Sequence, residues 1–255
     1  EMSKVDASTG ITLSVHTSLC CPCINEFGTE EQKQKWLRPL VDDSKIGCFG
    51  LTEPGAGTDA AGVKTEAAKD ENGDYILNGT KIFTTNSGFA DTFIVFALTD
   101  KSKGPKGMSA FIVDRNSEGL SVGPNIERMG IRAAANCEVI YENVKVPKEN
   151  LLGKEGQGYK IAMTALGGGR IGIGAQSVGI AQGAIDETLK YVKERKEVKN
   201  KEGLPKIAVL SLETPRCWHW SLYFDGTFYD PEHGVMNDFP ECKRKYYWEI
   251  KENIC

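Results

Sequence analysis

Residues 46–59, which read IGCFGLTEPGAGTD, are the stretch around which the rest of the chain is organised. Gly55 and Gly57 follow a proline with one alanine between them, so the backbone there can take positive φ angles and expose N–H groups that no strand or helix uses. The hydroxyls of Thr52 and Thr58 add donors, and the aspartate that ends the stretch can cap the following turn. This loop is typical of a site for an anionic or carbonyl-rich ligand, although an ordinary surface turn has the same composition.

The composition is that of a soluble globular protein of 255 residues, with 40% hydrophobic and 26% charged residues. Lysine and arginine number 31 against 35 acidic residues, and this net charge of −4 favours neither nucleic acid nor an anionic membrane surface. We find no apolar run of membrane-spanning length and no secretory signal pattern. The chain starts at Glu1 rather than methionine, which we interpret as a truncated or processed start.

Eight cysteines occur without a regular framework. Cys20 and Cys23 form a CxxC, but a tetrahedral metal site needs a second pair of ligands at compatible spacing, and none is evident. We therefore expect small buried thiols and predict no metal site. With Cys48 and Cys137 on expected strands, the pattern favours a reducing compartment.

The periodicity changes along the chain. Residues 1–45 predict helices, one of which begins with Thr29 as its N-cap. From 46 to 150 the period is two, and Asn78-Gly79 between alternating apolar segments predicts a hairpin. Further strands are expected at residues 92–98, 108–113, 120–123 and 138–142. This spacing predicts a small antiparallel barrel or sandwich.

A long helical pattern follows Gly158 and contains glycines at 167, 168 and 169, each of which costs about 1 kcal/mol relative to alanine. Further glycines at 172, 174, 179 and 183 continue a stripe of small residues, which is typical of close helix packing. The alternative is that a ligand passes over the glycines and meets Arg170, whose guanidinium suits a phosphate or ribose group.

Residues 198–255 differ from the rest. They carry three of the four tryptophans and several prolines, and we find no sustained period of 3.6 or 2. We interpret them as a foreign or out-of-frame tail, with a genuine appended module as the alternative.

Several strings together resemble one family. They are LTEPGAGTD at 51–59, NGTKIFTTN at 78–86, KGMSAFIV at 106–113, MGIR at 129–132, VPKENLLGKEGQGYKIAM at 146–163, GGRIGIGAQ at 168–176 and YVKERK at 191–196. Through these strings, about residues 1–197 of the chain resemble the acyl-CoA dehydrogenases. The resemblance is strongest to the short-chain, butyryl-CoA dehydrogenase-like type.

The resemblance implies an α+β fold. Residues 1–45 would be the end of an N-terminal helical domain whose first helices are missing, so that a normally covered helix face is exposed. Residues 46–150 would be a middle β-barrel domain, 151–197 the first helix of a C-terminal helical domain, and 198–255 an unrelated or out-of-frame tail.

The resemblance also implies an FAD-dependent flavoprotein of fatty acid metabolism that dehydrogenates the α and β carbons of short-chain acyl-CoA such as butyryl-CoA. No side chain accepts hydride, so a flavin must do so. The intact enzyme would be a homotetramer that passes electrons to an electron-transferring flavoprotein, in the bacterial cytoplasm or, alternatively, the mitochondrial matrix.

Carried over position by position, the resemblance implies these FAD-binding residues: Phe49, Leu51, Thr52, Gly57, Thr58, Phe83, Thr84, Thr85 and Arg195. The substrate-binding residues implied are Thr58, Gly167, Gly168, Gly169 and Arg170. Four features depart from the family pattern: Phe83 replaces the usual tryptophan, Gly167 stands where short-chain members often have an acidic residue, Ala133-Ala134 replaces Gly-Ser, and Arg195 lacks the Phe-Gly that normally follows.

The family's catalytic base is a glutamate in or near a Tyr-Glu-Gly-Thr segment of the C-terminal domain, and no such segment follows residue 197. We therefore assign no catalytic residue and predict that this chain alone, as a fragment, is inactive. Two other functions remain open. One is a non-catalytic flavin or acyl-CoA binding module with a partner-binding tail, and the other is a structural interaction protein.

Overall fold

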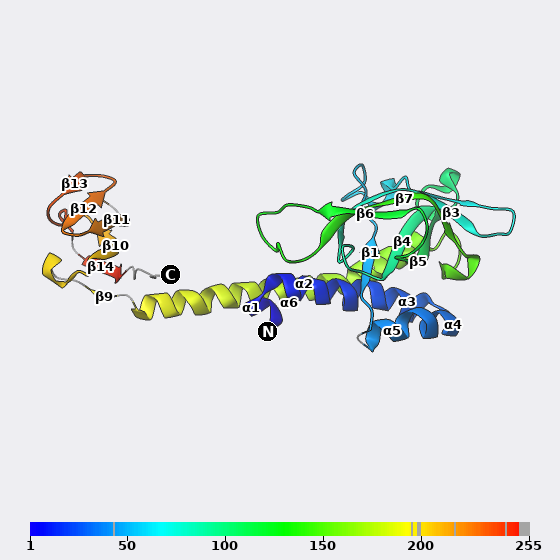
Figure 1. The fold of residues 1–255 in the computed structure, drawn as a ribbon, viewed down its shortest axis with the longest axis horizontal. Helices are drawn as coiled ribbons and strands as arrows, with labels where there is room; N and C mark the ends of the chain where they lie inside the picture. The colour runs from blue at the N-terminus through cyan, green and yellow to red at the C-terminus, as the bar shows by residue number, and fades with distance from the viewer. Residues whose placement is uncertain (43, 195, 198–199, 217, 243, 250–255) are drawn as a thin grey trace. The chain divides into compact units, whose positions relative to one another are not determined.

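The computed structural model describes residues 1–42, 44–194, 196–197, 200–216, 218–242 and 244–249. The chain divides into two compact units, Glu1–Gly183 and Ala184–Cys255, each of which contains its own β-sheet (Figure 1). No helix among the described residues is both long and apolar enough to cross a membrane.

The first unit consists of short helices, a curved sheet and most of one long helix. Its helical elements are α1 (Met2–Val5), α2 (Ala7–Val15), η1 (His16–Cys20), α3 (Cys21–Phe27), α4 (Glu30–Gln32), η2 (Lys33–Leu37), α5 (Arg38–Val41), η3 (Ala60–Gly62), η4 (Lys101–Gly107), η5 (Lys148–Asn150) and α6 (Gly158–Glu194). Its strands are β1 (Gly47–Gly50), β2 (Glu66–Lys69), β3 (Tyr75–Thr85), β4 (Thr92–Leu98), β5 (Met108–Asp114), β6 (Leu120–Asn125), β7 (Asn136–Val146) and β8 (Leu151–Leu152).

The N-terminal helices follow the sequence signals closely. Thr29 caps α4 as expected, in a capping box with Gln32. The segments η1 and η2 are π-helical turns, and each is followed two residues later by a proline, Pro22 or Pro39. Proline lacks an N–H and its ring clashes with the carbonyl four residues earlier, so it favours this local widening of the helix.

The sheet of the first unit has the strand order β6-β7-β3-β2-β4-β5-β8, with β1 paired to β4. The α+β class is confirmed, but the predicted barrel is not closed, because no pairing among the described strands joins β6 to β8. The sheet is not purely antiparallel either, since β1 and β2 both pair with β4 in parallel.

Two hydrophobic cores lie on opposite faces of β4. Ile94 and Phe96 face a core shared with the N-terminal helices and α6, whereas Phe93 and Val95 face the inner core of the curved sheet. A strand that is buried on both faces needs a continuous apolar run, and residues 92–98 provide it.

The hairpin predicted at Asn78-Gly79 is wrong, because both residues lie inside the continuous strand β3. Gly79 has φ +151°, and a Cβ there would lie 2.8 Å from the Cα of Thr65. Asn78 and Asn143 of β7 are joined by two hydrogen bonds: the Asn78 side-chain amide donates to the Asn143 side chain at 3.1 Å, and the Asn143 backbone N–H donates to the Asn78 side chain at 2.8 Å. The glycine therefore allows a close crossing at a register shift rather than a turn.

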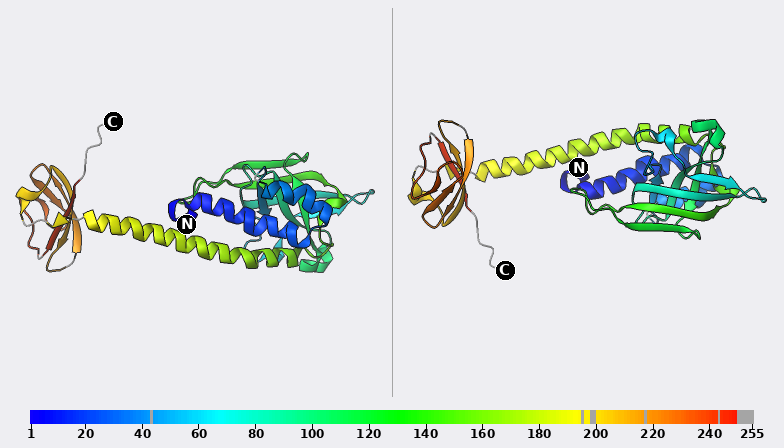
Figure 2. Two further views of the ribbon diagram at one scale, coloured as in Figure 1. Left: turned by 90° about the horizontal axis from the view of Figure 1, so that it is seen from below. Right: turned by 90° about the horizontal axis from the view of Figure 1, so that it is seen from above.

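The N-terminal helices run beside the first part of α6 (Figure 2). A Cβ at Gly169 would lie 2.7 Å from a Leu19 methyl group, and one at Gly183 would lie 2.3 Å from the Lys4 carbonyl oxygen. These glycines are needed for close helix packing. The exposed face was expected on the N-terminal helices, where Val5, Leu13 and Val41 are exposed, and α6 in addition exposes Ile171 and Val178.

The second unit contains strands β9 (Lys196–Glu197), β10 (Ile207–Glu213), β11 (Trp218–Phe224), β12 (Thr227–Asp230), β13 (Gly234–Met236) and β14 (Arg244–Glu249), with the short helix η6 (Lys201–Gly203). They form one sheet with the order β13-β12-β11-β10-β14-β9.

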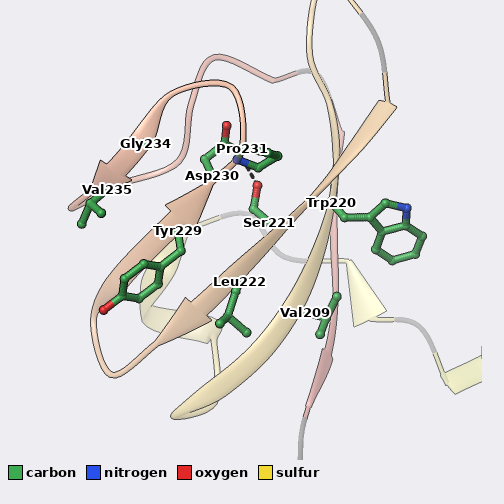
Figure 3. Close-up of a pocket in the computed structure, with 9 residues that line it drawn as sticks. All are labelled: Val209, Trp220, Ser221, Leu222, Tyr229, Asp230, Pro231, Gly234 and Val235. Atoms are coloured by element: carbon green, nitrogen blue, oxygen red, sulfur yellow. Dashed lines mark hydrogen bonds between the residues drawn. The ribbon is translucent and has the colours of Figure 1, made fainter.

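This region forms strands although its sequence shows no sustained period of two. In β11, Trp220 and Leu222 are exposed while Ser221 and Tyr223 are buried. Burial alternates but hydropathy does not, because bulky apolar side chains lie on both faces of the strand. Figure 3 shows Trp220 and Leu222 from the exposed face beside the buried hydrogen bond from Ser221 to Asp230.

Candidate functional site

The loop after β1 is folded back on itself. Glu53 and Ala56 exchange two backbone hydrogen bonds of 3.0 Å, and the Thr52 carbonyl accepts a 2.8 Å hydrogen bond from the Ile82 N–H of β3. The loop is therefore anchored to the middle of the sheet on the N-terminal side of its glycines.

The glycines of this loop do not use the left-handed backbone that they allow. Neither Gly55 nor Gly57 has a positive φ. A Cβ added at either residue would have no atom within 4 Å, so the space beside them is open. The predicted cap is present, since the Asp59 side chain accepts a 3.1 Å hydrogen bond from the Ala61 N–H.

A cavity of about 390 Å³ lies between this loop, β3 and the helices of the first unit. Its lining comes from four parts of the chain. They are Val15 and Leu19 of the N-terminal helices; Phe49, Leu51, Thr52, Gly57, Thr58, Asp59 and Ala60 of β1 and its loop; Ile82, Phe83 and Thr85 of β3; and Tyr159, Met163, Leu166 and Arg170 of α6. This volume and the mixture of apolar walls with a few polar groups are typical of a small-molecule site.

A β-bulge in β3 directs its side chains into the cavity. Lys81 pairs with Val139 and Thr84 pairs with Cys137, so three steps on β3 match two on β7. Phe83 lies in the bulge with φ +55° and is 56% exposed. Positive φ is unfavourable for a bulky residue, and it occurs here where an aromatic ring is held at a cavity wall.

A buried ion pair lies behind the same wall. The Lys81 ammonium is fully buried and lies 2.7 Å from Glu53 Oε1 and 3.2 Å from the Leu51 carbonyl oxygen. The Glu53 carboxylate also accepts hydrogen bonds from the N–H groups of Lys64 and Thr65 and from the Thr65 hydroxyl.

The electrostatics of this pair favour two charged groups at neutral pH. Burial tends to raise the pKa of Glu53, but the Lys81 ammonium and the hydrogen bonds lower it overall. Burial lowers the pKa of Lys81 to about 8, against the attraction of Glu53. At pH 7 the pair is therefore ionised.

The fourth wall is one face of α6. Tyr159, Met163, Leu166 and Arg170 follow one another at intervals of four, three and four residues, which places them on one side of a helix. Arg170 brings a guanidinium to a cavity whose other lining residues are mostly apolar or hydroxylic.

Comparison with known proteins identifies the family. Models of the N-terminal, middle and C-terminal domains of acyl-CoA dehydrogenase match residues 1–44, 48–144 and 156–202. The chain belongs to the acyl-CoA dehydrogenase family.

Individual members of this family agree with that assignment. The short-chain specific acyl-CoA dehydrogenase of Clostridium acetobutylicum is 55% identical over 197 residues, which are 77% of this chain and 52% of that protein. The structure of butyryl-CoA dehydrogenase from Megasphaera elsdenii superposes with a TM-score of 0.75 at 51% identity, covering 80% of this chain and 52% of that one. The structure of the acyl-CoA dehydrogenase from Bacillus anthracis complexed with FAD superposes with a TM-score of 0.70 at 42% identity, covering 74% of this chain and 32% of that one. The chain spans about half the length of the curated relatives it matches.

The structure brings most of the predicted site residues of this acyl-CoA dehydrogenase family member to the one cavity. The residues that line it are Phe49, Leu51, Thr52, Gly57, Thr58, Phe83, Thr85 and Arg170. Thr84 does not line it, because the bulge turns its side chain into the protein, where it is 1% exposed. Arg195 lies outside the described residues.

The three predicted glycines of α6 do not line the cavity and differ from one another. Gly169 packs against Leu19, whereas a Cβ at Gly167 or Gly168 would meet no atom within 4 Å. Close helix packing thus explains Gly169, and the open space beside the other two leaves room for a ligand.

Sequence reasoning missed several lining residues of this family member. Tyr159 and Met163 belong to the helical spacing that ends at Arg170, so an i, i+4, i+7, i+11 search from that arginine would have found them. Val15 and Leu19 gave no such signal, because their place beside the cavity depends on tertiary packing. Glu53 and Lys81 lie inside quoted motifs, but nothing in a sequence shows that they pair.

The cysteine cluster is buried in this acyl-CoA dehydrogenase fold. Cys20 and Cys23 are fully buried free thiols, and Cys21 is half-buried. Burial raises the pKa of Cys21 to about 11 and that of Cys23 to about 12. Among the described residues, no group of three or more His, Cys, Asp or Glu side chains is placed to hold a metal ion.

These thiols are expected to resist alkylation in the folded protein. At pH 8, a thiol of pKa about 12 has roughly a thousandfold less thiolate than one with the ordinary value of 9.0, and burial slows it further. Iodoacetamide labelling of residues 5–33, followed by mass spectrometry, should therefore be at least about a thousandfold slower for Cys23 in native than in denatured protein. Rapid labelling of the native protein at this cysteine would contradict the buried arrangement.

Proposed function

We propose that this site serves the FAD-dependent α,β-dehydrogenation of a short-chain acyl-CoA such as butyryl-CoA. The observation that supports the proposal is the convergence of Thr52, Thr85, Phe83 and Arg170 on one cavity from three parts of the fold. Family membership supports the same reaction, and the relatives include a short-chain specific acyl-CoA dehydrogenase.

The residues present fit a flavin. The Phe83 ring offers an exposed aromatic face for stacking, although it lacks the indole N–H of the tryptophan usual at this position. Thr52 and Thr85 offer hydroxyl groups to the polar edges of a ring, and the open space beside Gly55 and Gly57 allows a ligand to approach the backbone. A bound flavin supplies the hydride acceptor that no side chain provides.

On the substrate side, we propose that Thr58, Gly167, Gly168, Gly169 and Arg170 accommodate the CoA moiety. The open space beside Gly167 and Gly168 supports this role, and the Arg170 guanidinium suits a phosphate group. Gly169 contributes through its packing against Leu19, which lets α6 approach the N-terminal helices.

In the intact enzyme, we propose a homotetramer that passes electrons to an electron-transferring flavoprotein, in which Arg195 reaches the flavin diphosphate of a neighbouring subunit. We also propose domain limits at 1–45, 46–150, 151–197 and 198–255. Family-model matches that end at residues 44, 144 and 202 support this division approximately.

For the 255-residue polypeptide itself, we propose flavin binding without turnover, because residues 198–255 contain no Tyr-Glu-Gly-Thr segment to supply the base. Titration with FAD should give a saturable, approximately equimolar complex. An assay with butyryl-CoA and a dye acceptor should then show no turnover above the protein-free rate. Absence of FAD binding would contradict the site assignment, and turnover at a rate typical of the family would contradict the proposed inactivity.

The alternative is a non-catalytic flavin or acyl-CoA binding module whose second unit recruits a partner. The exposed face of the second sheet favours it, because a hollow of about 570 Å³ there is lined by apolar residues that include Trp220, Leu222 and Val235 (Figure 3). Supplying the C-terminal half of a full-length family member in trans distinguishes the two, because turnover would then indicate that this chain contributes to an enzyme.

A further inference from the structure

The loop that carries Thr52 is not held by a sheet ladder. Its backbone forms one two-residue bridge, Glu53 with Ala56, and otherwise depends on side chains and on single hydrogen bonds. A loop of this kind has many accessible conformations unless other groups fix it, and a ligand that needs one conformation binds more weakly when the loop is free.

Three consecutive residues of the loop are tied to two consecutive residues of β3. Lys81 Nζ donates to the Leu51 carbonyl at 3.2 Å and to Glu53 Oε1 at 2.7 Å, and the Ile82 N–H donates to the carbonyl of the intervening Thr52 at 2.8 Å. One buried ammonium therefore holds the neighbours of Thr52 on both sides.

The Glu53 carboxylate extends this attachment across the protein. Besides Lys81, it accepts hydrogen bonds of 2.6 and 3.0 Å from the N–H groups of Lys64 and Thr65 and one of 2.6 Å from the Thr65 hydroxyl. The segment before β2, the loop and β3 are thus joined at one charged centre. We call Glu53 and Lys81 the 53–81 clamp.

Stability alone does not require such a pair. Replacing a buried ion pair by uncharged groups of similar size is often neutral or stabilising, whereas removing one partner is strongly destabilising. The geometry of the clamp supports another role, since its polar contacts reach the two residues on either side of Thr52, a residue that lines the cavity.

We propose that Glu53 and Lys81 are positioning residues that hold the Thr52 hydroxyl in the direction required for flavin binding. This inference rests on the proposed function, because it takes a flavin as the ligand of the cavity. The clamp does not touch the ligand itself and acts through the loop backbone.

The experiment uses a pair variant, Glu53→Gln with Lys81→Met, which removes both charges together. Thr52→Val removes only the hydroxyl, and Lys145→Met removes an exposed lysine that pairs with Asp70 and Asp74. All of these, and the pair variant combined with Thr52→Val, are titrated with FAD. Hydrogen–deuterium exchange is measured on each protein without ligand.

We expect Thr52→Val to weaken FAD binding roughly five- to tenfold, as for loss of one hydrogen bond. The pair variant should weaken it by a similar factor, and the combined variant by little more than Thr52→Val alone, because the clamp acts through that hydroxyl. Without ligand, amides of residues 51–66 should exchange at least about tenfold faster in the pair variant, with residues 92–114 unchanged. Lys145→Met should behave as wild type in both measurements.

Two results would overturn the proposed role of the 53–81 clamp. One is unchanged hydrogen–deuterium exchange in residues 51–66 of the pair variant. The other is a loss of FAD affinity in the combined variant that equals the sum of the losses in the pair variant and in Thr52→Val. A wild-type chain that binds no FAD would refute the proposed function instead. In that case the exchange measurement still decides whether Glu53 and Lys81 fix the loop.

Discussion

Replacing Lys81 alone with methionine is expected to destabilise the first unit by about 3–5 kcal/mol. The substitution leaves the Glu53 carboxylate, which is only 7% exposed, without its counter-charge. It also removes the hydrogen bond that Lys81 donates to the Leu51 carbonyl oxygen. Trp36 is buried and is the only tryptophan among residues 1–183, so its fluorescence reports unfolding of this unit once Trp218, Trp220 and Trp248 are replaced by phenylalanine. Urea denaturation of the protein with these three tryptophans replaced, with and without Lys81→Met, measures the decrease in the free energy of unfolding.

The matched control is Lys145→Met, which also removes a lysine ion pair but at a side chain that is 53% exposed. Exposed ion pairs contribute at most about 1 kcal/mol, so this control should unfold close to the parent protein. Adding Glu53→Gln to Lys81→Met should recover much of the loss, because it removes the unpaired charge. A cost below about 1 kcal/mol for Lys81→Met would show that water reaches Glu53 or that the pair is not formed.

Replacing Phe111 with alanine should have a similarly large effect, about 3–5 kcal/mol, because it opens a cavity in a close-packed core. Phe111 is fully buried in β5 and packs edge-on against Tyr75, with their ring centroids 4.8 Å apart. The measurement is the same urea titration followed by Trp36 fluorescence.

Phe89→Ala is the control for this substitution, since Phe89 belongs to the same unit and is 43% exposed. It removes the same number of atoms, and we expect a loss of less than about 1 kcal/mol. Equal losses at the two positions would mean that the inner face of the sheet is not packed as described.

Much of the first unit was predictable from sequence because its local signals agree with its tertiary structure. The Thr29 cap marks the start of α4, and the apolar run at 92–98 coincides with β4. These signals are reliable because they depend on neighbours in the chain and on burial, which a linear pattern records.

The errors have a common cause, which is that the decisive partner lies far away in sequence. Asn78-Gly79 is a strong turn signal, but Thr65 and Asn143 use these residues for a close crossing inside a strand. In β11, large apolar groups on the exposed face concealed an alternation that the structure shows clearly. Closure of the sheet likewise depends on strand pairings that no local pattern specifies.

The residues of the candidate site also fall into two groups, those that the sequence motifs predicted and those whose placement depends on distant contacts. The quoted motifs predicted Thr52, Phe83 and Thr85, and all three line the cavity. The inward orientation of Thr84 was not predictable, because a regular strand carries no sign of an inserted residue.

The extra residue in β3 has a consequence for how the gene for this protein can change. Loss of the Phe83 codon would make two steps on β3 match two on β7, so the alternation would be regular and Thr84 and Thr85 would keep their present faces. Such a deletion would remove only the exposed aromatic ring from the cavity wall. Lineages that lack this one codon should therefore still present Thr85 to the cavity and bury Thr84.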